Sequence, residues 1–166
     1  MAWFRRKDKK INSPEKKEIP DGLWEKCPSC EEVLYRPEVD KNFSVCHHCN
    51  YHFRVDSDLY LKLLLDDNTY DELFNKIESK DFLEFSAKKK YSDQIIDAKN
   101  KTGDKNAIKV FRGKMNEHSI VLGIMNFKFI AGSMGSVVGE IISRSIDLAE
   151  KDKIPLILVC ASGGAR

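Results

Sequence analysis

The hydrophobic positions of the C-terminal part of the chain predict a strand–helix–strand unit. Apolar residues alternate over 107–112 and return over 118–127, which indicates two strands joined by a turn at Gly113–Glu117. The run 154–161 predicts a further, fully buried strand. A helical stripe with spacings of three and four lies before that run, at Val137, Val138, Ile141, Ile142, Ser145, Ile146 and Ala149. We therefore expect a βαβ crossover, which is typical of an α/β fold.

Glycine-rich bends follow both strands of this crossover. Residues 131–136 read Ala-Gly-Ser-Met-Gly-Ser, and residues 162–166 read Ser-Gly-Gly-Ala-Arg. Because such crossovers are right-handed, both bends should lie at the same edge of the sheet, where α/β folds bind ligands. Glycine lets a ligand approach the backbone N–H groups, although glycines also simply make tight turns. Neither bend matches a phosphate-binding lysine loop or a dinucleotide fingerprint, and Ser162 has no evident base partner.

Four of the five cysteines form two Cys-x-x-Cys pairs separated by fifteen residues, Cys27/Cys30 and Cys46/Cys49. This spacing favours one zinc ion held by four thiolates at about 2.3 Å, a closed shell without a position for substrate. A redox pair and unrelated buried thiols are the alternatives. The zinc is therefore expected to be structural.

Other residues near the cysteine pairs lead to three smaller expectations. Glu31 and Asn50 occupy positions where such knuckles need a positive φ. His47 and His48 are expected to be exposed knuckle residues, since four cysteines already satisfy the metal. Cys160 lies in the last apolar run and is expected to be a buried core thiol.

The remaining segments are polar or charged. Residues 1–22 form a tail whose first seventeen residues hold seven Lys or Arg against two acidic residues, so this part carries +5 and the rest −3 of the net +2. A solvated, disordered arm is the simplest interpretation, and a weak polyanion contact is the alternative. Residues 57–105 are expected to be a helical and irregular connection, with a short helix capped by Ser57 or Asp58 and a surface helix over 91–100 that ends near Gly103.

The composition limits the class of protein. With 166 residues and 42% hydrophobic residues, the chain is large enough for one ordinary domain or two small ones, and it is not wholly disordered. The longest apolar run, 154–161, is too short to cross a bilayer, and no secretory core follows the basic start. The expected location is the cytoplasm.

Three motifs in order resemble the bacterial acetyl-coenzyme A carboxylase carboxyltransferase subunit β family. They are the two cysteine pairs, residues 129–140 (Phe-Ile-Ala-Gly-Ser-Met-Gly-Ser-Val-Val-Gly-Glu) and residues 160–166 (Cys-Ala-Ser-Gly-Gly-Ala-Arg). The resemblance extends from Ile19 to the last residue and implies a zinc ribbon over 23–56. It also implies that 106–166 form the first part of a crotonase-like (β-β-α superhelix) domain, which is incomplete in this chain.

The resemblance also implies an activity and partners. The family transfers a carboxyl group from carboxybiotin on a carrier protein to acetyl-CoA, giving malonyl-CoA for fatty acid synthesis. Its partners are a carboxyltransferase subunit α in an α2β2 assembly, the biotin carboxyl carrier protein and biotin carboxylase, the component that brings ATP binding to the complex. Because the family's domain continues beyond Arg166, we expect this chain alone to be inactive.

The resemblance assigns roles to individual residues. Cys27, Cys30, Cys46 and Cys49 would bind zinc, and the backbone amides of Gly163 and Gly164 would form an oxyanion hole for the biotin ureido oxygen. The residues expected to line the same cleft are Gly132, Ser133, Met134, Gly135, Ser136, Ser162 and Arg166. The family usually has two glycines where Ala131 and Gly132 stand, and a methyl at position 131 is tolerated if φ is negative there.

Two readings of another class remain. A zinc-ribbon nucleic-acid-binding module with a basic arm would explain the ribbon and the tail. A purely structural ribbon that docks a partner chain would explain the cysteines. Both leave the glycine bends unexplained.

Overall fold

The computed structural model describes residues 22–67 and 70–166. Apart from Gly22, the basic tail predicted for 1–22 lies outside the described residues. The chain divides into two compact units, with the boundary between Arg54 and Val55. The first unit holds residues 23–54 of the ribbon predicted over 23–56, and residues 55 and 56 fall in the second unit. The predicted connection, 57–105, contributes its helices and a strand to the second unit.

The first unit is a small ribbon followed by a short helix. Strands β1 (Trp24–Lys26) and β2 (Val33–Tyr35) pair antiparallel, and α1 (Arg36–Lys41) begins directly after β2 with Pro37 in its first turn, where a missing N–H costs nothing. The buried core consists of few side chains: Cys27, Leu34, Val39 and Cys46. Two of these four residues belong to the cysteine pairs, so the predicted metal site is also the centre of the unit.

The second unit contains a four-stranded sheet of order β3-β4-β5-β6. Its strands are β3 (Asp71–Leu73), β4 (Ile108–Met115), β5 (His118–Met125) and β6 (Leu156–Val159). β5 and β6 run parallel and the other pairs antiparallel, so the predicted hairpin and crossover are both present. The turn is shorter than predicted, because Asn116 and Glu117 both take a positive φ and close a two-residue hairpin loop.

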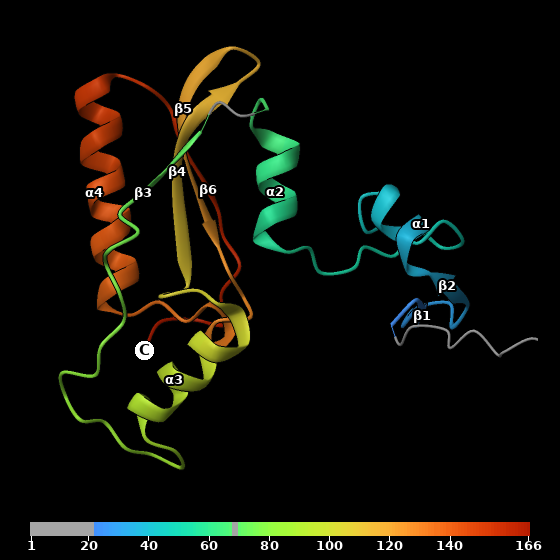
Figure 1. Cartoon of the computed structure of the whole chain (residues 1–166), viewed down its shortest axis with the longest axis horizontal. Helices are drawn as coiled ribbons and strands as arrows, with labels where there is room; N and C mark the ends of the chain where they lie inside the picture. Colours follow the sequence, from blue (N-terminus) through green and yellow to red (C-terminus); the bar gives the residue numbers. More distant parts are fainter. Residues whose placement is uncertain (1–21, 68–69) are drawn as a thin grey trace, which may run out of the picture. The chain divides into compact units, whose positions relative to one another are not determined.

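Helices cover both faces of the sheet (Figure 1). Helix α4 (Ser136–Asp152) connects β5 to β6 and packs on one face, and α2 (Ser57–Leu64) packs on the other. Strand β5 is buried on both sides because its side chains alternate between the two cores. The α4 core includes Ile108, Val110, Val121, Met125, Val138, Ile141 and Ala149. The α2 core consists of Leu61, Leu65, Phe111, Ile120, Leu122 and Ile124.

The third helix of this unit, α3 (Tyr91–Thr102), ends at Gly103, which has a φ of 72°. The predicted glycine stop is therefore confirmed, since the left-handed conformation satisfies the end of a helix and suits glycine. α3 lies against the 3-10 turn η1 (Ile130–Gly132), which follows β5. This contact places α3 beside the first glycine bend.

Two expectations about the last strand are wrong. The run 154–161 was expected to be fully buried, but β6 is half-buried over its whole length. Among the strands that the structure describes, β6 pairs only with β5 and forms an edge of the sheet. Cys160 is exposed rather than buried, because it lies beyond the last paired residue of β6 and its Sγ lies 3.9 Å from the Leu158 carbonyl oxygen.

Asp104 joins β4 to the residues after β5 through two contacts. One carboxylate oxygen lies 2.7 Å from Lys109 Nζ, and the other accepts a 2.6 Å hydrogen bond from Asn126 Nδ2. Replacing Asp104 by Ala leaves Lys109 half-buried without its counter-ion, so we expect a loss of about 2 kcal/mol in the free energy of unfolding, measured by urea titration. Asp97→Ala, which removes an exposed pair with Lys89, is the matched control and should cost under about 0.5 kcal/mol.

The same pair gives a pH dependence. Burial lowers the pKa of Lys109. The hydrogen bond and charge of Asp104 raise this pKa by more than burial lowers it, so the pKa lies above its ordinary value of 10.5. A raised lysine pKa stabilises the fold below the unfolded value and loses that contribution as the pH rises through the folded pKa. The wild-type protein should therefore lose stability faster than Asp104→Ala above about pH 10.5. Equal slopes in this range would contradict the assignment.

No helix in the described part of the chain combines the length and the apolar character that a membrane span requires.

Candidate metal centre and glycine bends

The two cysteine pairs fold into matching knuckles. In the first, the amide of Glu31 donates to the Cys27 carbonyl at 2.9 Å, and Cys27 N–H donates to Glu32 at 2.9 Å. In the second, the amide of Asn50 donates to the Cys46 carbonyl at 2.9 Å, and Cys46 N–H donates to Tyr51 at 2.8 Å. The predicted positive φ values are confirmed, at 63° for Glu31 and 58° for Asn50. Each knuckle thus turns its backbone so that two sulfurs point the same way.

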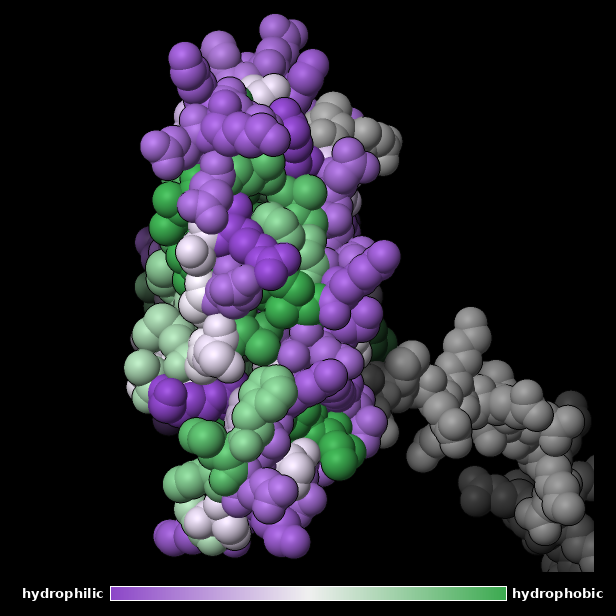
Figure 2. Space-filling view, turned by 90° about the vertical axis from the view of Figure 1, so that its left-hand side faces the viewer, coloured by the Kyte–Doolittle hydropathy of each residue, from purple (hydrophilic) through white to green (hydrophobic). Residues whose placement is uncertain are grey.

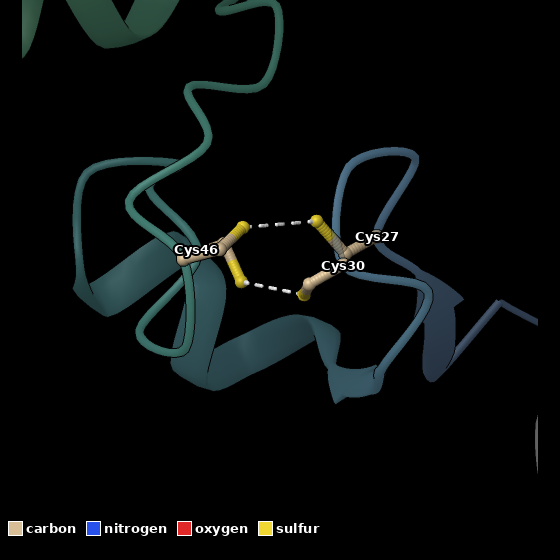
Figure 3. Close-up of side chains that lie close together, drawn as sticks. Cys27, Cys30 and Cys46 are labelled. Carbon is tan, nitrogen blue, oxygen red and sulfur yellow. Dashed lines mark hydrogen bonds between the residues drawn. The ribbon is translucent and has the colours of Figure 1, made fainter.

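The knuckles bring four sulfurs to one point (Figure 3). Cys27 Sγ lies 3.7 Å from Cys49 Sγ, and Cys30 Sγ lies 3.8 Å from Cys46 Sγ. All four sulfurs lie within 4.8 Å of one another. A tetrahedron with zinc–sulfur bonds of about 2.3 Å has edges of about 3.8 Å, so these distances fit a four-thiolate zinc site. The predicted ligand set therefore suits a structural zinc ion.

Without a metal, the pKa values of Cys30 and Cys49 are shifted in opposite directions. At Cys30, a backbone hydrogen bond from Glu32 favours the thiolate, but burial and the three neighbouring cysteines outweigh it and raise the pKa to about 12. At Cys49, burial raises the pKa, but hydrogen bonds from the Tyr51 backbone and from neighbouring side chains lower it to about 7 overall. A divalent cation among the sulfurs would favour the thiolate at all four positions. His47 and His48 are both exposed, as predicted, and their ring centroids lie 4.2 Å apart.

The two glycine bends of the second unit lie side by side. Their backbones are joined by three hydrogen bonds: Gly163 N–H to the Ala131 carbonyl at 2.8 Å, Met134 N–H to Gly164 at 3.0 Å, and Arg166 N–H to Met134 at 3.1 Å. Met134 and Ala165 form an isolated parallel bridge. The carboxyl ends of β5 and β6 are thus continued by a paired segment that leads into the first turn of α4.

Glycine is required at position 132 because the backbones approach closely. Its φ is +64°, and a Cβ there would lie 2.0 Å from the Ala161 carbonyl oxygen. The condition of a negative φ at Ala131 is not met, because its φ is 53° and its ψ 31°. This conformation accompanies the hydrogen bond that the Ala131 carbonyl accepts from Gly163, and an alanine pays a steric cost for it that glycine would not.

Both amides assigned to the oxyanion hole have acceptors within the chain. Gly163 N–H donates to Ala131, as above, and Gly164 N–H donates to Ser162 Oγ at 3.0 Å. Ser162 is exposed, so its hydroxyl can leave Gly164 by rotation of one side chain. The first N–H groups of α4, from Ser136 onward, have no intrahelical acceptor and lie at the same place. Backbone N–H donors are therefore gathered at this place, and those of Gly163 and Gly164 are hydrogen-bonded within the chain.

A cavity of about 600 Å³ opens beside the bends. Ser133, Gly135, Ser136 and Arg166 line it, together with α3 and the segment before α3. The Arg166 guanidinium lies over the Tyr91 ring, 4.5 Å from its centroid, and a Cβ on Gly135 would lie 3.0 Å from Arg166 Nε. The residues that the sequence did not indicate are Lys80, Asp81, Phe82, Leu83, Phe85, Tyr91 and Gln94. No motif marks them, because their contact with the bends arises from the packing of α3 on η1.

This cavity combines apolar walls with positive groups. Phe82 and Leu83 are 77% and 88% exposed, and hydrophobic side chains are visible at the lower end of the second unit in Figure 2. Lys80 and Arg166 supply two cations against the one carboxylate of Asp81, and the start of α4 contributes the positive end of the helix dipole. Such a cavity is suited to an anionic group carried on an apolar body.

Comparisons with known proteins agree with the two-part organisation. Residues 24–49 match the acetyl-CoA carboxylase zinc finger domain. The chain is 48% identical over 168 residues to the acetyl-coenzyme A carboxylase carboxyl transferase subunit beta of Pedobacter heparinus, and the alignment covers 100% of this chain and 60% of that relative. The proteins of the same name from Christiangramia forsetii and Prosthecochloris aestuarii are 45% and 41% identical, with 59% and 60% of their lengths covered.

Solved structures share the fold at low identity. A transcarboxylase 12S structure with hydrolyzed methylmalonyl-coenzyme A bound aligns with a TM-score of 0.55 at 17% identity, over 80% of this chain and 22% of that one. The β subunit of Pseudomonas aeruginosa geranyl-CoA carboxylase aligns with a TM-score of 0.50 at 18% identity, over 79% and 20%. At this level of identity, these matches support only the fold of this chain.

The predicted class, a four-cysteine zinc ribbon followed by part of a crotonase-like α/β domain, is confirmed by these findings. The chain spans about 60% of the length of the curated relatives that it matches. By sequence, the whole chain is similar to part of the proteins named acetyl-coenzyme A carboxylase carboxyl transferase subunit beta, and residues 24–49 match the acetyl-CoA carboxylase zinc finger domain.

Proposed function

We propose that this chain provides the zinc ribbon and the glycine-bend part of a carboxyltransferase that moves a carboxyl group from carboxybiotin to acetyl-CoA, giving malonyl-CoA for fatty acid synthesis. The observation that carries the proposal is the paired bends at the carboxyl ends of β5 and β6, because they gather backbone donors beside a cavity lined by two cations and one carboxylate. The name of the relatives, at 41–48% identity over the whole chain, supports the same reaction.

The bends would stabilise negative charge that develops in the reaction, and they would not act as a general acid or base. Transfer of the carboxyl group leaves negative charge on the ureido oxygen of biotin, and preorganised N–H donors stabilise such charge by about 2.7–4 kcal/mol each. Gly163 and Gly164 are the proposed donors, and the ureido nitrogen would take the acetyl methyl proton. This assignment needs no side-chain base near Ser162. It does require that the amides exchange their present acceptors for the developing oxyanion.

The remaining site residues would bind the substrates. The bend Gly132, Ser133, Met134, Gly135 and Ser136 would form one wall of the cleft, with Ser162 and Arg166 on the other. Arg166 is held between the Tyr91 ring and Gly135, so its guanidinium is fixed where an anionic substrate group could reach it. Zinc would stay structural in the ribbon, held by four thiolates with no position for a substrate.

The proposed assembly follows the family. A carboxyltransferase subunit α would complete an α2β2 enzyme, a biotin carboxyl carrier protein would present carboxybiotin, and biotin carboxylase would load it with ATP. The proposed location is the cytoplasm. The alternative of a nucleic-acid-binding module is not favoured, because it gives no role to the paired bends.

Malonyl-CoA formation tests the proposed function. The full-length protein that contains this chain, assembled with subunit α and supplied with carboxylated carrier protein and acetyl-CoA, should give malonyl-CoA. This 166-residue chain with subunit α should give none. An inactive full-length assembly with intact zinc would contradict the proposed reaction, and turnover by the short chain would contradict the need for the rest of the domain.

Ser162 offers a test of the donor assignment. In the full-length assembly, Ser162→Ala removes the present acceptor of Gly164 N–H and leaves that amide free for the oxyanion. We therefore expect kcat to stay within about threefold of wild type or to rise, because one neutral hydrogen bond is worth little net energy. Ser162→Thr, which keeps the hydroxyl, is the control. A fall of tenfold or more in the alanine variant alone would give the hydroxyl itself a role in the reaction.

A further inference from the structure

The outer face of the ribbon exposes an aromatic pair. Trp24 on β1 lies directly opposite Tyr35 on β2, and their ring centroids are 5.2 Å apart with the planes tilted by 48°. Side chains alternate along a strand, so Leu34 enters the core while Val33 and Tyr35 face outward. Trp24 is 56% exposed and Val33 62%. Large apolar side chains grouped on so small a unit indicate a contact surface.

These side chains border a shallow hollow of about 480 Å³. Its lining consists of Trp24, Val33, Tyr35, Glu38 and His47, all from the first unit. The two rings and Val33 provide apolar surface, and Glu38, near the start of α1, provides a carboxylate. Aromatic faces beside a carboxylate are the chemistry that binds a cationic side chain.

The charges around the hollow favour a cationic ligand over an anionic one. The Glu38 carboxylate has no ion-pair or hydrogen-bond partner among the described residues, whereas Arg36 and Lys26 are both engaged. Arg36 is paired with Glu25 and Asp40, and Lys26 lies 2.9 Å from Glu31. The formally charged group that lines the hollow is therefore negative and unpaired. A nucleic-acid base stacked on the same rings would bring its phosphates toward this carboxylate.

We propose that this hollow, defined by Trp24, Val33, Tyr35, Glu38 and His47, binds an arginine side chain of a partner protein. A guanidinium is planar and weakly hydrated, so it stacks on an aromatic ring while its edge donates to a carboxylate. A lysine ammonium can donate to the carboxylate, but it is not planar and cannot stack on the ring in this way. The inference concerns the ribbon alone and does not depend on the carboxyltransferase reaction.

The two tryptophans of the chain, Trp3 and Trp24, allow a direct test with the whole zinc-loaded chain. In Trp3→Phe, one indole N–H signal remains, and its NMR shift reports on the hollow. Titration with N-acetyl-arginine amide should move this signal saturably, and N-acetyl-citrulline amide, which has the same shape without the charge, should not. Equal responses to both compounds, or no saturable response to either, would overturn the proposal.

Variants separate the contribution of the carboxylate from that of the aromatic ring. Glu38→Gln and Tyr35→Leu should each weaken arginine-amide binding about two- to fivefold, the range expected for an exposed cation–π contact or ion pair. Glu32→Gln, whose exposed carboxylate lies outside the lining and has no ion-pair partner among the described residues, is the matched control and should bind like wild type. Zinc content and the dispersion of the amide spectrum check that each variant is folded. Unchanged affinity in Glu38→Gln, or tighter binding of a short oligothymidylate than of the arginine amide, would reject the arginine site.

Discussion

Removing zinc should unfold the first unit and leave the second unit folded. Cys27 and Cys46 are half of the buried core of the ribbon, and the two strands of this unit have three residues each. Zinc binding to such sites contributes about 10–16 kcal/mol, far more than this small core supplies by burial. The second unit has two cores of its own that contain no cysteine of the cluster. We expect amide signals of 23–54 to lose their dispersion after chelation, while those of β4 and β5 persist.

Cys46→Ser should reproduce the effect of the chelator, because it removes one buried ligand. Cys160→Ser is the matched control, since that thiol is exposed and outside the cluster, and it should leave zinc content and stability unchanged. Acid should also release the metal, because protons compete with zinc for the thiolates. A dispersed ribbon spectrum in the metal-free protein, or one zinc per chain in Cys46→Ser, would contradict the structural role.

The features that local sequence determines were predictable. Two Cys-x-x-Cys pairs place four sulfurs together because each knuckle is closed by hydrogen bonds within six residues, and the need for a positive φ at Glu31 and Asn50 follows from the same local geometry. The end of α3 at Gly103 and the hairpin of β4 and β5 are equally local. In each case the residues that fix the conformation are neighbours in the chain.

The features that depend on distant contacts were missed or wrong. Cys160 looked buried because its strand is apolar, but burial requires cover on both sides of a strand, and β6 has a partner strand on one side among those described. The positive φ of Ala131 accompanies a hydrogen bond from Gly163, more than thirty residues away. The short strand β3 carries no alternating pattern and forms only by pairing with β4. The cavity residues on α3 could not be predicted either, because they reach the bends only through the packing of α3 on η1.

Gly132→Ala should be the most damaging single change in the glycine bends. The added Cβ would lie 2.0 Å from the Ala161 carbonyl oxygen, so the two bends must separate. Steric overpacking of this kind costs about 1–3 kcal/mol, and the positive φ adds about 1 kcal/mol. We expect the free energy of unfolding of the second unit to fall by about 3 kcal/mol in a urea titration. In the full-length assembly, kcat should fall about 100-fold, because a displacement of about 1 Å misplaces the donors.

Gly103→Ala separates the two contributions to this loss. Gly103 also has a positive φ, of +72°, but a Cβ there meets no atom within 4 Å. This variant should therefore cost about 1 kcal/mol, the conformational part alone, and should leave kcat unchanged, since Gly103 lies at the end of α3 outside the lining of the cavity. The difference between the variants then measures the contact between Gly132 and Ala161. Equal losses would mean that the bends separate without cost, and the donors would then not be held in place by this contact.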